Sequence, residues 1–224
     1  FSPCADKALQ FALTIAEKSG GEIILLHACN LNNEKSSNPY SSPVSNKPIT
    51  QTAATKLEVL KKHMAQRGNV TATVQLFDGD VLESILDTET KHPVDLIVMG
   101  TQGATGIKKI IMGSKTAATI SKAKAPVIAI PANYTGTSIS HILLAVNQTD
   151  QSFEYLQPLF TLANLFGAKL RMVIFSGSEE AATYVSDRRT ITGLQFKLQE
   201  KYGQQNIETD HLTGKDFEEA LQTY

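Results

Sequence analysis

Apolar residues in the first half of the chain recur with two alternating periods, one typical of strands and one typical of helices. The segment "EIILLHA" (22–28) is a continuous apolar run, whereas "VTATVQL" (70–76) alternates apolar and polar residues. A continuous run predicts a strand covered on both faces, and an alternating run predicts a strand with one wetter face, as at a sheet edge. Two further strands are predicted at "VDLIVMG" (94–100) and "PVIAI" (126–130).

Helical spacing fills the intervals between these runs. The first helix is expected to follow Ser2, a good N-cap, with Pro3 in its first turn, and to end near Gly20. Three more helices are predicted over about 48–68, 80–90 and 114–123. Helices that alternate with strands are typical of α/β proteins with a parallel sheet. The polar, Ser/Asn/Pro-rich segment 30–48 is expected to be a loop.

The second part of the chain repeats the first. Residues 154–176 have the helix, glycine and strand order of residues 7–29, and "LTGKDFEEAL" (212–221) echoes "FDGDVLESIL" (77–86). Self-similarity of this kind predicts two related domains. We assign them to residues 1–135 and 136–224.

Each copy lacks one end of the expected α/β unit. The second copy opens with the strand "HILLAVN" (141–147), which has no counterpart before Phe1, and the chain reaches Tyr224 before any counterpart of the 98–115 segment. A sheet without an interior strand would leave two rows of backbone groups unpaired. We therefore expect the natural protein to continue before Phe1 and after Tyr224, with strands supplied by another chain as the alternative.

Overall charge and composition exclude several classes of function. The net charge is −1, from 21 basic and 22 acidic residues, so no overall field favours nucleic acid or an anionic membrane. Neither a membrane-spanning run nor a signal peptide is visible, and a cytoplasmic location is expected. Cys4, Cys29 and the five histidines lack metal-site spacing, which favours free thiols and structural or surface histidines.

The segment "VMGTQGATGIKKIIMGSK" (98–115) is the candidate for chemistry. Its apolar strand ends at Gly100, and a helix starts again after Gly113 and Ser114. A helix N-terminus at the carboxyl end of a parallel strand presents free amides and about half a positive charge, which suits a phosphate. Neither GxxxxGK[ST] nor GxGxxG occurs, so the segment is not a Walker loop or a dinucleotide fingerprint. The alternative is a tight strand-to-helix connection, although that would need one glycine rather than three.

The order Gly100, two residues, Gly103, nine residues, Gly113 and Ser114 resembles the ATP-binding branch of the universal stress protein family. The likeness extends over nearly the whole chain, and it includes the strand at 22–28 and the closing strand "PVIAI". It implies an α/β fold with two tandem open parallel five-stranded sheets flanked by helices, in the strand order 3-2-1-4-5. The first domain would lack its first strand, and the second would be incomplete at its C-terminus.

The resemblance also implies a nucleotide site in the first domain. Met99 and Gly100 would line the nucleotide, Ala28 would flank adenine, and Gly103 would let the loop fold over the phosphates. Four residues would grip phosphate through amides and hydroxyls: Gly113, Ser114, Lys115 and Thr116.

The second domain is not expected to bind nucleotide. The family's adenine-side Asp would lie before Phe1 in the first copy, and Asn147 stands at that position in the second. An Asn keeps its hydrogen bonds but has no charge. The expected role of this domain is to pair with the first.

The expected function is an adenine-nucleotide-binding regulatory protein of the stress response, with ATP or another adenine nucleotide bound, with or without Mg²⁺. No catalytic set is found, because Asp78 and Asp80 are equally well explained as turn and N-cap residues. Weak ATP hydrolysis or autophosphorylation is left open. The alternatives are an interaction or scaffold protein that binds no nucleotide and, less favoured, an ATP-using enzyme. Expected partners are an unknown protein, the other domain and a second copy that pairs at the edge strand "PVIAI".

Overall fold

The structure is a computed structural model that describes residues 1–29, 47–68, 70–101, 112–136, 138–146, 153–177, 181–203 and 207–224. The chain divides into two compact units, Phe1–Thr137 and Ser138–Tyr224. The sequence repeat places the domain boundary at 135, close to this division.

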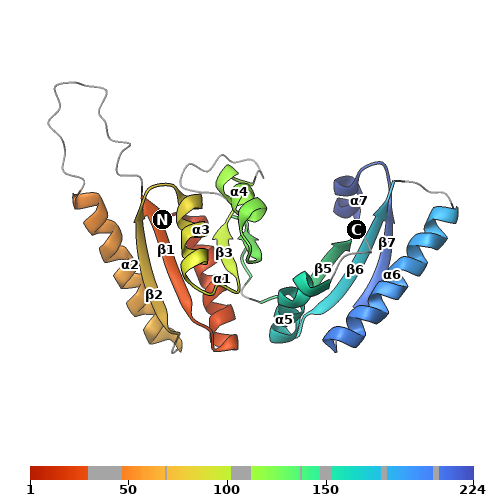
Figure 1. The fold of residues 1–224 in the computed structure, drawn as a ribbon, viewed down its shortest axis with the longest axis horizontal. Coiled ribbons are helices and arrows are strands. Elements are labelled where there is room, and N and C mark those ends of the chain that lie inside the picture. Colours follow the sequence, from red (N-terminus) through yellow and green to blue (C-terminus); the bar gives the residue numbers. More distant parts are fainter. Residues whose placement is uncertain are drawn as a thin grey trace, which may run out of the picture. The chain divides into compact units, whose positions relative to one another are not determined.

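The first unit alternates helices and strands along the chain (Figure 1). Its elements are α1 (Pro3–Ser19), β1 (Ile23–Cys29), α2 (Lys47–Gly68), β2 (Ala72–Asp78), α3 (Val81–Lys91), β3 (Ile97–Gly100), α4 (Ser114–Lys122) and β4 (Val127–Ile130). The hydrophobic periodicity predicted this order of helices and strands, and the structure confirms it. Much of the predicted 30–48 loop lies outside the described residues.

The helix boundaries follow from the capping residues. Ser2 Oγ accepts a hydrogen bond from the Ala5 amide at 3.1 Å, and α1 ends at Gly20 in the left-handed conformation with a φ of 69°. Asp80 Oδ1 accepts from the Leu82 amide at 2.8 Å, which confirms Asp80 as the N-cap of α3. Such side chains satisfy amides that a helix leaves unpaired in its first turn.

Two separate parallel ladders hold the strands of the first unit. β1 pairs with β2, and β3 pairs with β4. Among the described residues neither ladder has a third strand, and all residues of β1 and β3 are half-buried rather than covered on both faces. A single five-stranded sheet is therefore not observed. The strand order that the family resemblance implies therefore stays a prediction.

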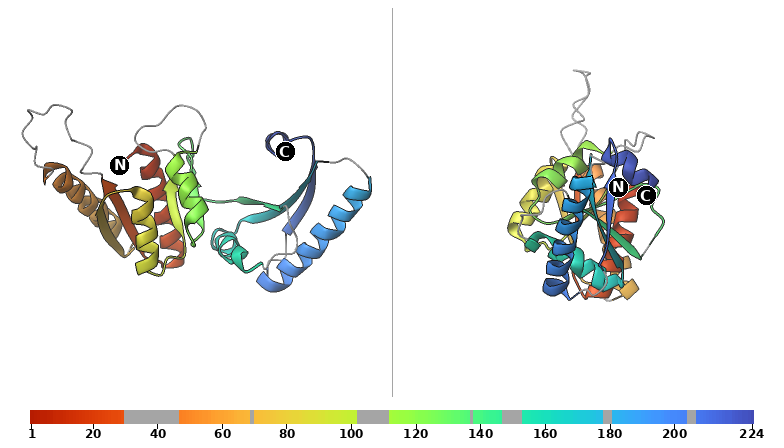
Figure 2. Two further views of the ribbon diagram at one scale, coloured as in Figure 1. Left: turned by 45° about the horizontal axis from the view of Figure 1, so that its top comes forward. Right: turned by 90° about the vertical axis from the view of Figure 1, so that its right-hand side faces the viewer.

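The helices of the first unit form two layers around the strands. Leu13 and Ala16 of α1 are buried in one cluster with Met64 of α2, with Val70 before β2 and with Ala72, the first residue of β2. α3 and α4 contact each other and lie on the other side of the strands (Figure 2). This arrangement, with helices on both faces of parallel strands, is typical of α/β proteins.

The second unit has one three-stranded parallel sheet with the strand order β5-β6-β7. Its elements are β5 (His141–Val146), the 3-10 helix η2 (Phe153–Leu156), α5 (Gln157–Phe166), β6 (Lys169–Ser176), α6 (Ala181–Tyr202), β7 (Ile207–Thr213) and α7 (Phe217–Thr223). Phe160 of α5, Leu198 of α6 and Met172 of β6 are almost completely buried in its core. The helix–glycine–strand order that predicted a repeat is present here, with Gly167 in the left-handed conformation after α5.

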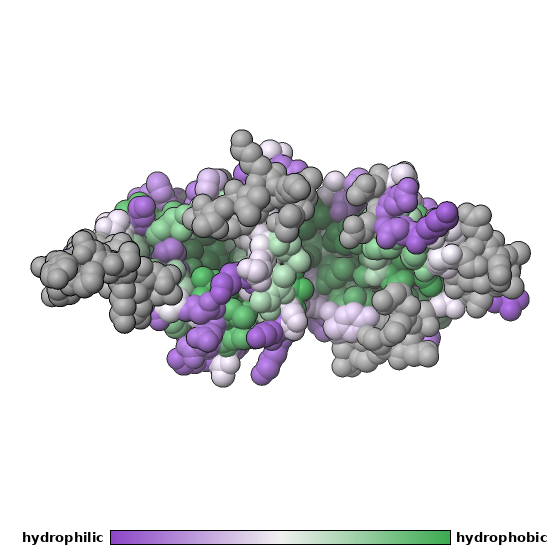
Figure 3. Space-filling view, turned by 90° about the horizontal axis from the view of Figure 1, so that it is seen from above, coloured by the Kyte–Doolittle hydropathy of each residue, from purple (hydrophilic) through white to green (hydrophobic). Residues whose placement is uncertain are grey.

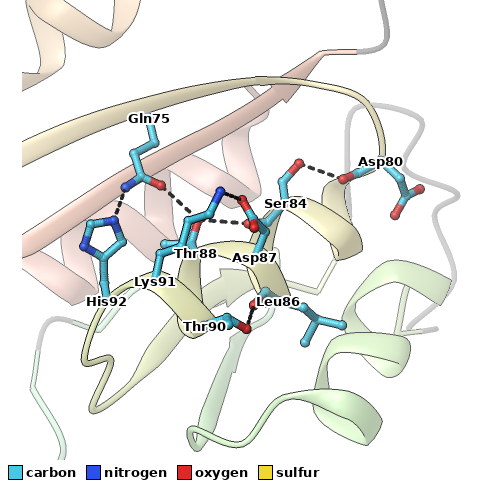
Figure 4. A network of polar contacts seen from close by, with 9 residues as sticks. All are labelled: Gln75, Asp80, Ser84, Leu86, Asp87, Thr88, Thr90, Lys91 and His92. Atoms are coloured by element: carbon cyan, nitrogen blue, oxygen red, sulfur yellow. Dashed lines mark hydrogen bonds and ion pairs between the residues drawn. The ribbon is translucent and has the colours of Figure 1, made fainter.

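Polar contacts fasten α3 to its neighbours in the first unit (Figure 4). Thr88 Oγ1 donates to Gln75 Oε1 on β2 at 2.9 Å, and Gln75 Nε2 lies 2.9 Å from His92 Nε2. On the same helix, Glu89 Oε1 accepts from the amide of Lys124 at 2.8 Å and from that of Ala125 at 2.5 Å. These contacts link α3 both to β2 and to the turn between α4 and β4.

A second close contact joins α1 to the end of β3. A Cβ placed on Gly100 would lie 2.7 Å from Cys4 Sγ and 3.0 Å from the Cys4 carbonyl carbon. Cys4 is buried, and its thiol donates to the Ile130 carbonyl of β4 at 3.1 Å. Glycine at this position lets the first turn of α1 pack directly on β3.

The Glu89 contact predicts a specific loss of stability. Glu89→Ala removes the acceptor of two amides, one of them on buried Ala125, and should lower the free energy of unfolding by about 1–3 kcal/mol. Urea denaturation followed by circular dichroism measures it. Glu58→Ala, on an exposed position of α2, is the matched control, and an equal effect of both substitutions would contradict this role of Glu89.

The Gly100 contact predicts a second effect. Gly100→Ala forces a methyl group against Cys4 and should lower the free energy of unfolding by about 1–3 kcal/mol. Gly193→Ala in α6 is the control, because a Cβ there meets no atom within 4 Å and alanine favours helix. Thermal unfolding of both variants measures the difference. A Gly100 variant as stable as the parent chain would show that α1 does not need this close approach.

Candidate functional site

The starts of three helices meet at the carboxyl end of β3. Cys4 in the first turn of α1 contacts Gly100, and Thr116 in the first turn of α4 donates through Oγ1 to the Gly100 carbonyl at 2.9 Å. Asp80, the N-cap of α3, pairs with Lys115 of α4. Helix N-termini carry partial positive charge, so this edge of the first unit favours negative ligands. Figure 3 looks onto the molecule from the side at which these helices start.

One hydrogen bond joins the described ends of the glycine-rich segment 98–115, and another links this segment to β4. The Thr101 amide donates to the Ile130 carbonyl at 2.9 Å, and the Gly113 amide donates to the Thr101 carbonyl at 2.7 Å. Gly113 has a φ of −61°, which any residue adopts, but a Cβ there would lie 2.9 Å from the Thr101 carbonyl oxygen. Glycine at 113 therefore permits the close approach of the two ends. Gly103 lies outside the described residues.

The four residues expected to grip phosphate differ in what they offer. The Gly113 amide is bonded to Thr101, and the hydroxyl of buried Thr116 is bonded to Gly100. Ser114 is exposed at the first position of α4. The amides of Ser114, Lys115 and Thr116 belong to the first turn, whose N–H groups have no partner within the helix. These three amides and the Ser114 hydroxyl are therefore the groups of this set that a phosphate would contact.

Ala28 and Met99 hold equivalent places in separate ladders. Ala28 lies one residue before the carboxyl end of β1, and Met99 one residue before the carboxyl end of β3. Both are half-buried. Gly100 follows Met99, and the nearest atoms to a Cβ at Gly100 belong to Cys4, so protein packing accounts for this glycine without a ligand.

The ion pair between Lys115 and Asp80 was not predicted from the sequence. Asp80 accepts through Oδ1 from the amides of Leu82 and Glu83, and its Oδ2 pairs with Lys115. The hydrogen bond from Lys115 lowers the pKa of Asp80 below its ordinary value, and the bonds from the two amides lower this pKa further. Both oxygens of the Asp80 carboxylate are thus already bonded to protein groups.

Within the described ranges there is neither a candidate metal site nor a candidate membrane-spanning helix. No group of three or more His, Cys, Asp or Glu side chains there could hold a metal ion. Both cysteines are free thiols, as expected, and Cys29 Sγ lies 3.6 Å from the Phe77 carbonyl oxygen. No helix in this part of the chain is long and apolar enough to cross a membrane.

Comparison with known proteins identifies the family of the chain. The family model of the universal stress protein family matches residues 1–131. Universal stress protein MJ0577 of Methanocaldococcus jannaschii is 27% identical over 146 residues, which cover 58% of this chain and 89% of that protein. Universal stress protein MJ0531 of the same organism is 36% identical over 75 residues, which cover 33% of this chain and 44% of that protein.

Solved structures support the fold across both units. A universal stress protein from Archaeoglobus fulgidus DSM 4304 matches 96% of this chain and 77% of its own length, with a TM-score of 0.67 and 18% identity. A protein of unknown function from Pseudomonas aeruginosa PAO1, PA1789, matches 91% of this chain and 68% of its own, with a TM-score of 0.54 and 16% identity. At these identities the likeness concerns the fold alone. With the family model matching more than half of its length, this chain belongs to the universal stress protein family.

Proposed function

We propose that this chain is an adenine-nucleotide-binding regulatory protein of the stress response, with phosphates bound at the start of α4. The observation that carries the proposal is the strand–glycine–helix junction itself. Gly100 ends β3, Thr101 and Gly113 are bonded to each other, and α4 begins at exposed Ser114. Chain order and glycine spacing here resemble the family's ATP-binding branch.

The chemistry of the junction suits a phosphate more than an uncharged ligand. Amides in the first turn of α4 point toward its N-terminus, where about half a positive charge is concentrated. Ser114 adds an exposed hydroxyl, and Lys115 adds an ammonium on an exposed side chain. Ala28 and Met99, near the ends of β1 and β3, would then contact the base and ribose. Mg²⁺ would accompany ATP, and among the described residues no cluster of carboxylates could hold it.

A binding role accounts better for these residues than an enzymatic one. Asp80, the carboxylate beside α4, caps α3 and pairs with Lys115, so it is not placed as a general base. A phosphate at Ser114 would lie beside Gly113, which is bonded to Thr101 at the other described end of this segment. We propose that a partner protein, or a second copy, reads the surface of this segment in its nucleotide-bound form. The chain would be a tandem, cytoplasmic member of its family, in which the second unit pairs with the first.

Ser114→Asp tests the position of the phosphates. An aspartate at the first helical position favours the helix through its dipole, so the fold should be kept, but its charge would repel phosphate. We expect ATP affinity in titration calorimetry to fall about tenfold or more. Gln157→Asp places the same charge at the first position of α5 and should leave ATP affinity unchanged. Equal ATP affinity in the Ser114 variant and the parent chain would contradict the assigned site.

Occupancy of the purified protein tests the ligand class. Mass spectrometry of small molecules released on denaturation, from protein purified without added nucleotide, should detect ATP, ADP or AMP. Calorimetry with each nucleotide then ranks their affinities. If neither bound nucleotide nor heat of binding is found, the alternative of an interaction protein without nucleotide takes precedence.

A further inference from the structure

We propose that Asp80 competes with bound phosphate for Lys115, and that Asp80 thereby sets how strongly the site prefers highly charged nucleotides. The inference rests on the proposed nucleotide binding at α4. In the structure the Lys115 ammonium is paired with the Asp80 carboxylate. A phosphate at the start of α4 is a second, more highly charged acceptor for the same ammonium.

Asp80 supplies a negative charge that the first turn of α4 lacks, as a comparison with the starts of α1 and α3 shows. α1 has Asp6 and α3 has Glu83 in the first turn, where a negative charge is favourable, and each also has a side-chain cap. α4 has neither, since Gly113 makes no side-chain cap bond and its first turn holds Lys115 and no acid. A lysine is unfavourable at a positive helix end. Asp80, from the neighbouring helix, supplies the missing negative charge, as a bound phosphate also would.

The ion pair is exposed enough for Lys115 to leave Asp80 and bind a phosphate instead. The Lys115 side chain is 54% exposed and that of Asp80 is 37% exposed, so solvent screens their attraction. A phosphate carries more negative charge than one carboxylate, so it is the stronger acceptor for hydrogen bonds from the ammonium. When Lys115 turns to the phosphate, Asp80 stays nearby as a fixed negative charge, held by the amides of α3. Its repulsion grows with the charge of the ligand.

The two oxygens of Asp80 have separate contacts, so one substitution can change the contact with Lys115 and keep the cap of α3. Oδ1 accepts from the amides of Leu82 and Glu83, whereas Oδ2 pairs with Lys115. Asparagine is as good an N-cap as aspartate. Asp80→Asn therefore keeps the oxygen that caps α3 and removes the charge that Lys115 contacts.

Calorimetry of Asp80→Asn with ATP, AMP and adenosine tests the proposal. We expect roughly two- to fivefold tighter ATP binding, a smaller gain for AMP and no change for adenosine, with the ATP gain shrinking at high salt. If Asp80 acted only as an N-cap, its substitution would change the affinities for all three ligands alike. Asp87→Asn is the matched control, since Asp87 lies on the same helix and pairs with Lys91 at 2.7 Å.

A double-mutant cycle adds a second readout. Lys115→Met should weaken ATP binding more in the Asp80→Asn background than in the parent chain, because the lysine is then free for phosphate. Additive effects, or an Asp80→Asn variant that binds ATP like the parent chain, would overturn this inference while leaving nucleotide binding intact. Absence of nucleotide binding in both the parent chain and the Asp80 variant would overturn the proposed function, and this inference with it.

Discussion

The close approach of two helices to Gly100, at the carboxyl end of β3, is the constraint on which the geometry of the candidate site depends. The missing side chain lets Cys4 of α1 pack against β3, and the Gly100 carbonyl accepts the hydroxyl of buried Thr116. Because Cys4 also bonds Ile130, α1, β3, β4 and α4 meet within a few ångströms. The direction of the first-turn amides of α4 is fixed by these contacts, since Thr116 belongs to that same turn.

Local signals predicted most of the elements of the fold, because caps and periodicity act within a few residues. Ser2, Asp80 and Gly20 start or end helices as expected, and the strand at 97–100 ends at the predicted glycine. The helix α6 over Ala181–Tyr202 was not predicted. In α6, residues such as Ile191, Leu194 and Leu198 have helical spacing in the second half, after a polar stretch that weakens the pattern. The pairing of strands into sheets depends on distant contacts, which local periodicity does not contain.

The sequence predicted the strand–glycine–helix junction at which the candidate site is proposed, but not the contacts within it. The glycine spacing located the junction, but it could not distinguish a glycine that makes room for a ligand from one that makes room for protein. At Gly100 the neighbour is Cys4, and at Gly113 it is the Thr101 carbonyl. Both neighbours are set by tertiary packing or by closure of the segment. For the same reason the pairing of Asp80 with Lys115, 35 residues apart, left no sequence signal, although each residue had been singled out separately.

Charge at the helix starts links the fold to the proposed function. In an α/β unit every helix that follows a parallel strand starts at the same edge, so positive helix ends gather there whatever the protein does. The starts of α1 and α3 are neutralised locally, by their own side chains. α4 instead depends on Asp80, a residue of another helix, through an exposed pair that solvent weakens. A phosphate that displaces such a weak, exposed partner loses less in the exchange than one that would have to displace a buried partner.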